Sequence, residues 1–227
     1  MFDSGKPSRI LIVAPHPDDE TLGAGGTAAK LIAAGHRVTL LTVSGHLPPL
    51  YAKDAYETTV REAKEAYKIL GITDFSFLEI PATMVGAEPV HVLNGKISKA
   101  IKDASPDVVL CPFPDRHVDH RVIFDSVMVA TRPVGDARKI KLLAAYETLS
   151  ETHWNAPHIE PMFAPTWVVD ITKHIDAKLR ALACYKSQVT PFPGPRSVEA
   201  AEALAKFRGT QAGFAFGEGF QVIRAVS

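Results

Sequence analysis

Arg9-Ile-Leu-Ile-Val-Ala-Pro-His-Pro-Asp-Asp-Glu20 is the stretch of this 227-residue sequence from which the fold is best predicted. Its first half, residues 9–14, is short, apolar and rich in β-branched residues, which is typical of a strand buried on both faces of a parallel sheet. Its second half places one histidine and three carboxylates directly after that strand. Open α/β sheets bind ligands at the carboxyl ends of their strands. The stretch therefore predicts a parallel sheet with a polar site at the end of its first strand.

Helix-like and strand-like segments alternate through the next part of the chain. Gly35 and Gly71 each follow a helical pattern, at the place where helices commonly end. The predicted helices are Leu22–Ala34, Tyr51–Leu70, Val92–Ala104 and Val118–Ala130, and the predicted strands are Arg37–Val43, Phe75–Ile80 and Asp107–Cys111. Strands separated by helices predict a Rossmann-like α/β fold, a mostly parallel, doubly wound sheet with helices on both faces.

The alternation weakens after Lys139. The predicted strands there are Lys141–Glu147, Trp167–Asp170 and an irregular strand within 209–227, and the predicted helices are Ile171–Lys186 and Ser197–Phe207. The segment Ser150–Pro165 is irregular, and such long segments are usually functional or mobile. No repeat or linker divides the sequence, so we expect residues 1–227 to form a single domain.

The composition favours a small-molecule partner. The 25 basic residues balance the 25 acidic ones, so the sequence has no excess of positive charge with which to bind nucleic acid or an anionic membrane. Apolar runs such as Val38–Val43 are far shorter than the roughly 20 residues that cross a bilayer, so we expect no membrane insertion. Cys111 and Cys184 cannot form a disulfide framework, and Met1–Arg9 has no signal-peptide pattern. These features predict a cytoplasmic protein.

A second polar cluster follows the strand predicted at residues 107–111. The stretch Cys111-Pro-Phe-Pro-Asp-Arg-His-Val-Asp-His120 adds two histidines and two carboxylates just past a strand end. Either cluster alone could be a turn whose Asp caps the following helix. Two clusters at equivalent strand ends are better explained by one shared site. Imidazole and carboxylate are the ligands of catalytic Zn²⁺, so the two clusters predict a metal hydrolase.

The same motifs carry a resemblance to a known family. Ala14-Pro-His-Pro-Asp-Asp-Glu20, Leu22-Gly-Ala-Gly-Gly26 and Asp115-Arg-His-Val-Asp-His120 strongly resemble the PIG-L/LmbE-like deacetylases. The resemblance covers most of the chain, through Arg61-Glu-Ala63 to the tail Arg208–Phe220. It implies removal of the acetyl group from an N-acetylglucosamine-type sugar or conjugate, with a bound divalent metal that is usually zinc.

The resemblance also assigns roles to the first cluster. It implies that His16, Asp19 and His120 bind the metal and that Asp18 is the general base, although chemistry alone does not distinguish Asp18 from Asp19. Zinc lowers the pKa of its bound water to about 7, and a neighbouring carboxylate can take the proton of that water. Two histidines and one carboxylate can also bind Fe²⁺.

The second cluster is expected to supply electrostatic stabilisation. The resemblance implies that a protonated His117 stabilises the tetrahedral oxyanion, although chemistry alone does not distinguish His117 from His120. It also implies that Asp119 holds the His117 imidazole and favours its charged form.

Three further residues are candidates for substrate contacts. Arg61 matches a position that contacts sugar hydroxyls in the family, Arg116 lies within the second cluster, and Trp154 offers a platform for a sugar face. Family members often form dimers, trimers or hexamers, so the resemblance is compatible with a homo-oligomer.

Other classes of protein fit the sequence less well. His117-Val-Asp119 could belong to a 2-His-1-carboxylate Fe²⁺ oxygenase, but the first cluster would then have no role and the helical alternation is unlike a β-barrel. A non-catalytic metal-binding module would need a closed and usually thiolate-rich site, which the two cysteines do not provide. A dinucleotide loop is disfavoured because eight residues, Pro15–Leu22, separate the strand from Gly23.

Overall fold

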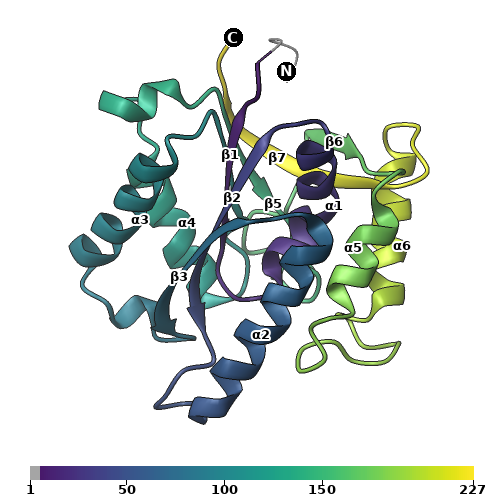
Figure 1. Cartoon of the computed structure of the whole chain (residues 1–227), viewed down its shortest axis with the longest axis horizontal. Coiled ribbons are helices and arrows are strands. Elements are labelled where there is room, and N and C mark those ends of the chain that lie inside the picture. The colour runs from purple at the N-terminus through teal and green to yellow at the C-terminus, as the bar shows by residue number, and fades with distance from the viewer. Residues whose placement is uncertain (1–5) are drawn as a thin grey trace.

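Seven strands form a single sheet in the computed structural model, which describes residues 6–227 (Figure 1). The strands are β1 (Arg9–Ala14), β2 (Arg37–Gly45), β3 (Asp74–Pro81), β4 (Val108–Pro112), β5 (Leu142–Tyr146), β6 (Trp167–Asp170) and β7 (Gly217–Ala225). Their order in the sheet is β3-β2-β1-β4-β5-β7-β6. Neighbouring strands from β3 to β5 are parallel, whereas β7 runs antiparallel to both β5 and β6. The predicted mostly parallel, Rossmann-like sheet is confirmed.

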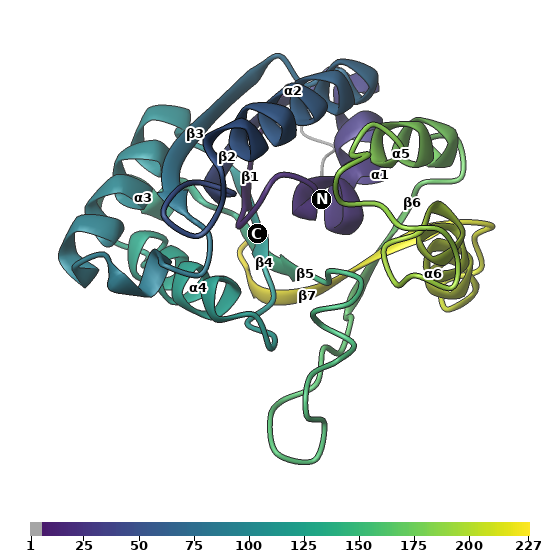
Figure 2. The same ribbon diagram turned by 90° about the horizontal axis from the view of Figure 1, so that it is seen from below.

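Helices cover both faces of this sheet (Figure 2). They are α1 (Asp19–Ala33), α2 (Lys53–Leu70), α3 (Val90–Ala104), α4 (Val118–Ala130), α5 (Ile175–Leu182) and α6 (Val198–Thr210), with short 3₁₀ turns η1 (Val85–Ala87) and η2 (Gly135–Lys139). On one face α1 packs against α2 and α5, and on the other α3 packs against α4. Within residues 6–227, none of the helices is long and apolar enough to cross a membrane.

β1 is an interior strand of the sheet, between β2 and β4, and its apolar sequence follows from burial on both faces. Side chains alternate between the two faces of a strand. Ile10 and Ile12 belong to the core cluster that includes residues of α1, α2 and α5. Leu11 and Val13 belong to the second cluster, with residues of α3 and α4. Every residue of β1 after Arg9 is therefore buried, and the strand fixes the position of the polar loop that follows it.

Two helices begin at residues other than the predicted ones for reasons that the hydrogen bonds show. Helix α1 begins at Asp19 rather than Leu22, because the carbonyl of Asp18 already accepts hydrogen bonds from the amides of Thr21 and Leu22. The predicted helix Ile171–Lys186 is confined to α5, because the amide of Ile171 instead donates to the carbonyl of Phe216 beside the sheet.

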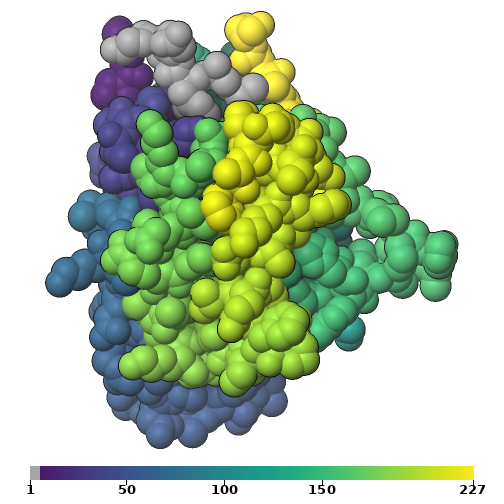
Figure 3. Space-filling view, turned by 90° about the vertical axis from the view of Figure 1, so that its right-hand side faces the viewer, coloured from purple at the N-terminus to yellow at the C-terminus, as the bar shows by residue number. Residues whose placement is uncertain are grey.

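The irregular segment predicted at Ser150–Pro165 extends away from the body of the protein. It has no regular secondary structure and forms an arm in Figure 2, which is the protrusion of the surface in Figure 3. Trp154, Ile159 and Met162 are exposed along it. The arm leaves the sheet directly after β5, at the same edge as the carboxyl ends of β1 and β4.

Candidate active site

The two polar clusters meet at the carboxyl edge of the sheet. β1 and β4 are adjacent parallel strands, so the loop after β1 and the loop before α4 lie side by side. They line an open cavity of about 190 Å³ together with residues of four other segments. Its lining residues are His16, Asp18, Asp19, His46, Tyr51, Ala82, Thr83, His117, His120, Glu151, Gln188 and Arg196. The predicted convergence of the two clusters is therefore observed.

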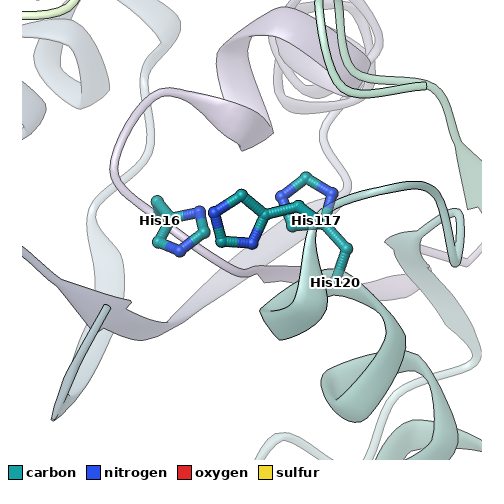
Figure 4. A group of neighbouring side chains, drawn as sticks. All are labelled: His16, His117 and His120. Carbon is teal, nitrogen blue, oxygen red and sulfur yellow. The ribbon is translucent and has the colours of Figure 1, made fainter. Parts of the chain in front are cut away.

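Three imidazole rings lie together in this cavity (Figure 4). His16, His117 and His120 each offer a ring nitrogen, and these atoms lie within 4.8 Å of one another. The ring centroids of His16 and His117 are 4.6 Å apart, and those of His117 and His120 are 5.0 Å apart. Such a group of nitrogen donors could hold a metal ion.

His120 has the environment of a metal ligand. Its Nδ1 donates to Oδ2 of the fully buried Asp115 at 3.0 Å, which leaves the lone pair on Nε2. Among the residues that the structure describes, Nε2 is buried and finds no hydrogen-bond partner. A buried polar atom left without a partner is costly unless something else satisfies it. A cation is one group that would do so.

Asp19 provides an oxygen beside this nitrogen. Its Oδ2 lies 3.3 Å from Nε2 of His120 and 3.1 Å from Nδ1 of His16. Burial alone would raise the pKa of Asp19, but the charges of His120 and His16 and the hydrogen bond with His16 hold that pKa well below its usual value. Two nitrogens and one carboxylate oxygen thus converge, and this donor set fits a divalent metal such as zinc.

Asp119 has a different contact from the expected one. Its carboxylate accepts hydrogen bonds from Nε2 of His16 at 3.0 Å and from the amide of Thr83 at 2.6 Å. Only its main-chain amide contacts His117, donating to Nδ1 at 3.2 Å. The expectation that the Asp119 side chain holds the His117 imidazole is therefore wrong. His117 caps α4, and the carboxylate two residues later points toward the loop after β1 instead.

Two sets of groups act on the protonation of His117. Burial, reinforced by the charges of His16 and His120, lowers the pKa of His117, and the charges of Asp119 and Asp19 oppose this. Because Nδ1 accepts a hydrogen bond, a neutral His117 ring carries its proton on Nε2 and remains an N–H donor. The protonated imidazole that the resemblance implies stays a prediction.

Asp18 lies in the same cavity beside Asp19. Its side chain is almost completely buried. Burial, reinforced by the negative charge of Asp19, raises the pKa of Asp18 to about 8, and Arg196 opposes this rise. A carboxylate whose pKa lies near neutrality can both take and return a proton during a reaction.

Arg196 and Glu151 are site residues that the sequence did not indicate. Arg196 places Nη1 3.5 Å from Oδ2 of Asp18, and it donates from Nη2 to Oε1 of Glu151 and from Nε to Ser150, both at 3.1 Å. Arg196 follows the proline-rich stretch Pro191–Pro195, which in the sequence only separates two predicted helices. Nothing in the local pattern reveals that this stretch crosses the cavity.

The three predicted substrate contacts lie in different places. Arg116 lies 5.9 Å from the centroid of the Trp154 ring, and its Nε is 4.0 Å from Glu151, so both residues stand near the cavity at the base of the arm. Arg61 is exposed on α2 and donates to Thr58 of its own helix. Within the part of the chain that the structure describes, Arg61 does not line the cavity.

A comparison with known families identifies this combination of fold and site. The family model described as "PIG-L: GlcNAc-PI de-N-acetylase" matches residues 11–131, which is more than half of the chain and includes both polar clusters. The chain belongs to the PIG-L family. The resemblance expected from the sequence motifs is confirmed.

Individual relatives extend the similarity beyond the matched region. The chain is 26% identical to a diacetylchitobiose deacetylase of Thermococcus kodakarensis, over 96% of this chain and 84% of the relative. It is 28% identical to a 1D-myo-inositol 2-acetamido-2-deoxy-alpha-D-glucopyranoside deacetylase of Actinosynnema mirum, over 81% of this chain and 82% of the relative. Among solved structures, a conserved protein of Thermus thermophilus is 29% identical, with a TM-score of 0.76 and coverage of 97% and 96% of the two chains.

Proposed function

We propose that this protein is a zinc-dependent hydrolase that removes the N-acetyl group from an N-acetylglucosamine-type sugar or conjugate. The observation that carries the proposal is the buried Nε2 of His120, which has no hydrogen-bond partner among residues 6–227 and lies beside the ionised Asp19 and His16, in a cavity that also holds Asp18. The two deacetylases among the relatives support the reaction class.

Zinc would be held by Nδ1 of His16, Oδ2 of Asp19 and Nε2 of His120. When bound, zinc supplies a Lewis acid that lowers the pKa of water to about 7 and polarises a carbonyl group. Fe²⁺ fits the same donor set. We assign Asp19 rather than His117 as the third ligand, because Asp19 is in hydrogen-bond contact with His16 and in ion-pair contact with His120, and is held ionised.

Asp18 acts as the general base. Its carboxylate takes a proton from the attacking water and later donates that proton to the nitrogen of the leaving amine. One group can do both because its pKa is raised toward neutrality by burial and by Asp19. Arg196, at 3.5 Å, faces the carboxylate and favours its charged form.

His117 stabilises the developing negative charge on the acetyl carbonyl oxygen. Its Nδ1 is engaged by the amide of Asp119, so its Nε2–H is left to donate toward the cavity. A preorganised donor of this kind contributes about 2.7 to 4 kcal/mol to catalysis. Asp119 acts on the other side of the site, where it orients His16 as a metal ligand.

We expect residues at the base of the arm to contact the parts of the substrate that lie beyond the acetamido group. We propose that Trp154 and Arg116 contact the sugar or the group attached to it, since they are paired beside Glu151 near the cavity mouth. Arg61 remains a predicted sugar contact without support from the cavity lining.

The test is release of primary amine by zinc-loaded protein from N-acetylglucosamine, a chito-oligosaccharide, and UDP-linked and inositol-linked N-acetylglucosamine. Amine release that is lost in Asp18→Asn would establish the reaction and rank the substrates. The proposal is wrong if the metal-loaded protein hydrolyses none of these amides while it consumes O₂ with 2-oxoglutarate. Consumption of O₂ would instead indicate the oxygenase.

A further inference from the structure

Asp18 has an unusual backbone conformation. Its φ is 123° and its ψ is −32°, in a region that residues with a side chain rarely adopt. Residues held in such conformations persist only where their surroundings constrain them, and they cluster at functional sites. The conformation turns the chain sharply between β1 and α1 and leaves the Asp18 carboxylate in the cavity beside Asp19.

Glu20 provides the constraint on the amino side of Asp18. The amide of Asp18 donates to Oε2 of Glu20 at 3.2 Å. The carbonyl of Asp18 is held separately by the amides of Thr21 and Leu22, at 3.0 and 2.8 Å. Both ends of the strained residue are therefore tied to the first turn of α1, and Glu20 is the only side chain that takes part within the described residues 6–227.

Glu20 is itself held by two hydroxyl groups. Its Oε1 accepts hydrogen bonds from the hydroxyl of Thr21 at 2.8 Å and from that of Tyr185. Tyr185 is fully buried and follows α5, so its hydrogen bond ties the start of α1 to the segment after α5. The side chain of Glu20 is 1% exposed and, in the described chain, does not line the cavity. Glu20 therefore lies behind the cavity-lining residues, and its carboxylate is engaged by Asp18, Thr21 and Tyr185.

We propose that Glu20, anchored by Tyr185 and Thr21, is a positioning residue that holds Asp18 in its strained conformation and so keeps the general base aimed into the cavity. This inference rests on the proposed role of Asp18 as the base. It concerns the geometry of the loop and differs from a purely structural role, in which Glu20 would merely join α1 to α5.

The primary variant is Glu20→Met, which has a similar length and removes both acceptor oxygens. A misplacement of about 1 Å at a reacting group can lower the rate about 100-fold, so we expect kcat to fall about 100-fold. KM and zinc content should stay unchanged, because no metal ligand or substrate contact is altered. Glu20→Gln should keep most of kcat, because its amide oxygen can still accept from Asp18 while the two hydroxyls accept from its NH₂ group.

A second buried pair, Lys178 of α5 and Glu218 of β7, also contacts α1 and supplies the matched control. Glu218 accepts hydrogen bonds from the α1 amides of Gly26 and Thr27, and it pairs with Lys178 of α5 at 2.6 Å. It joins the same two helices without touching Asp18. Replacing a buried ion pair by apolar residues of similar volume is often neutral for stability, so Lys178→Met/Glu218→Met should fold and keep its kcat.

Two measurements separate this inference from the proposed function. In a double variant, Asp18→Asn/Glu20→Met should be no slower than Asp18→Asn alone, because Glu20 acts only through Asp18. In a crystal structure of Glu20→Met, the φ of Asp18 should leave its positive value, whether or not the native protein is found to be a deacetylase. If Glu20→Met does not fold, Tyr185→Phe serves in its place, with a smaller fall in kcat and a similar change at Asp18.

The inference is overturned if Asp18 keeps its conformation in the variant structure, or if the Lys178→Met/Glu218→Met control loses as much kcat as Glu20→Met. It is equally overturned if Glu20→Met lowers the rate of a protein that already carries Asp18→Asn.

Discussion

Asp115 and His120 form a buried pair in which Nδ1 of the imidazole donates to Oδ2 of the carboxylate at 3.0 Å. The same carboxylate oxygen also accepts from the hydroxyl of Thr152 at 2.9 Å, and Oδ1 accepts from the amide of His117. Asp115 is thus held by three donors and cannot turn away from His120. The pair fixes both the tautomer and the orientation of the ring, so that Nε2 faces Asp19 and His16.

The first prediction concerns this pair. Asp115→Asn should lower zinc affinity by about 10- to 100-fold, because carboxylates behind a ligating histidine orient the ring and raise its basicity. Competition with a chelator of known affinity measures the change. Asp125 is exposed on α4, the helix that carries His120, so Asp125→Asn is the control and should bind zinc as the native protein does. Equal affinity in both variants would show that Asp115 does not support a ligand.

The second prediction distinguishes two ligand sets. Asp19→Ala should lose the metal, whereas His117→Ala should keep it and show a kcat about 100- to 1000-fold lower, as expected when an oxyanion donor is removed. Metal analysis after gel filtration, together with amine release, measures both effects. If His117→Ala loses the metal and Asp19→Ala retains it, the site is instead the three-histidine cluster of His16, His117 and His120.

The parts of the site that the sequence predicts are those fixed by local structure. His16, Asp18 and Asp19 follow β1, and His117 and His120 begin α4, so their convergence follows from the strand pattern and the rule that parallel strand ends share an edge. This rule does not apply to a residue in a long irregular connection, because its position depends on how the connection packs and not on a strand end.

The residues that sequence reasoning missed depend on tertiary packing. Arg196 reaches Asp18 only because a turn between α5 and α6 crosses the cavity, and Glu151 meets Arg196 because the arm begins beside it. Asp115 was visible within the second cluster, but its role depends on the fold of the loop before α4. Asp119 was assigned to the wrong histidine, because its side-chain direction depends on where α4 begins.

The third prediction concerns stability. Arg208 donates from Nε and Nη2 to the two carboxylate oxygens of Glu147, at 2.7 and 2.6 Å, and both side chains are largely buried. Arg208→Met leaves a buried carboxylate without its main partner and should lower the free energy of unfolding by roughly 3 to 5 kcal/mol at pH 7. Urea unfolding measures this change. Arg37→Met, which removes an exposed pair with Asp74, is the control and should cost about 1 kcal/mol or less.

The same pair should depend on pH. Burial alone would raise the pKa of Glu147, but hydrogen bonds from Arg208 and His153 and the charges of those residues lower it below its usual value. The unfolded chain therefore binds a proton at a higher pH than the folded one. The contribution of the pair is fully present above the pKa of an unfolded glutamate and is lost as the pH falls through the lower, folded value. The difference between the native protein and Arg208→Met should consequently shrink in acid, and a constant difference would contradict the assignment.

The fourth prediction concerns Arg196 and the general base. Burial and the charge of Asp19 raise the pKa of Asp18 to about 8, and Arg196 lowers it from what it would otherwise be. Because the base must be ionised in the free enzyme, kcat/KM should rise with pH through this pKa. Arg196→Met removes the opposing charge, so the rising limb of the profile should move to higher pH. Well below the limb, each unit of displacement lowers kcat/KM about tenfold at a fixed pH. Arg180→Met, which removes an exposed pair with Asp176 on α5, should leave the limb in place. A limb that stays fixed or moves to lower pH in Arg196→Met would mean either that Asp18 is not the base or that Arg196 does not act on it. The profile of Asp18→Glu, which retains a carboxylate, decides between the two. The limb should move in Asp18→Glu if Asp18 is the base and should stay in place if it is not.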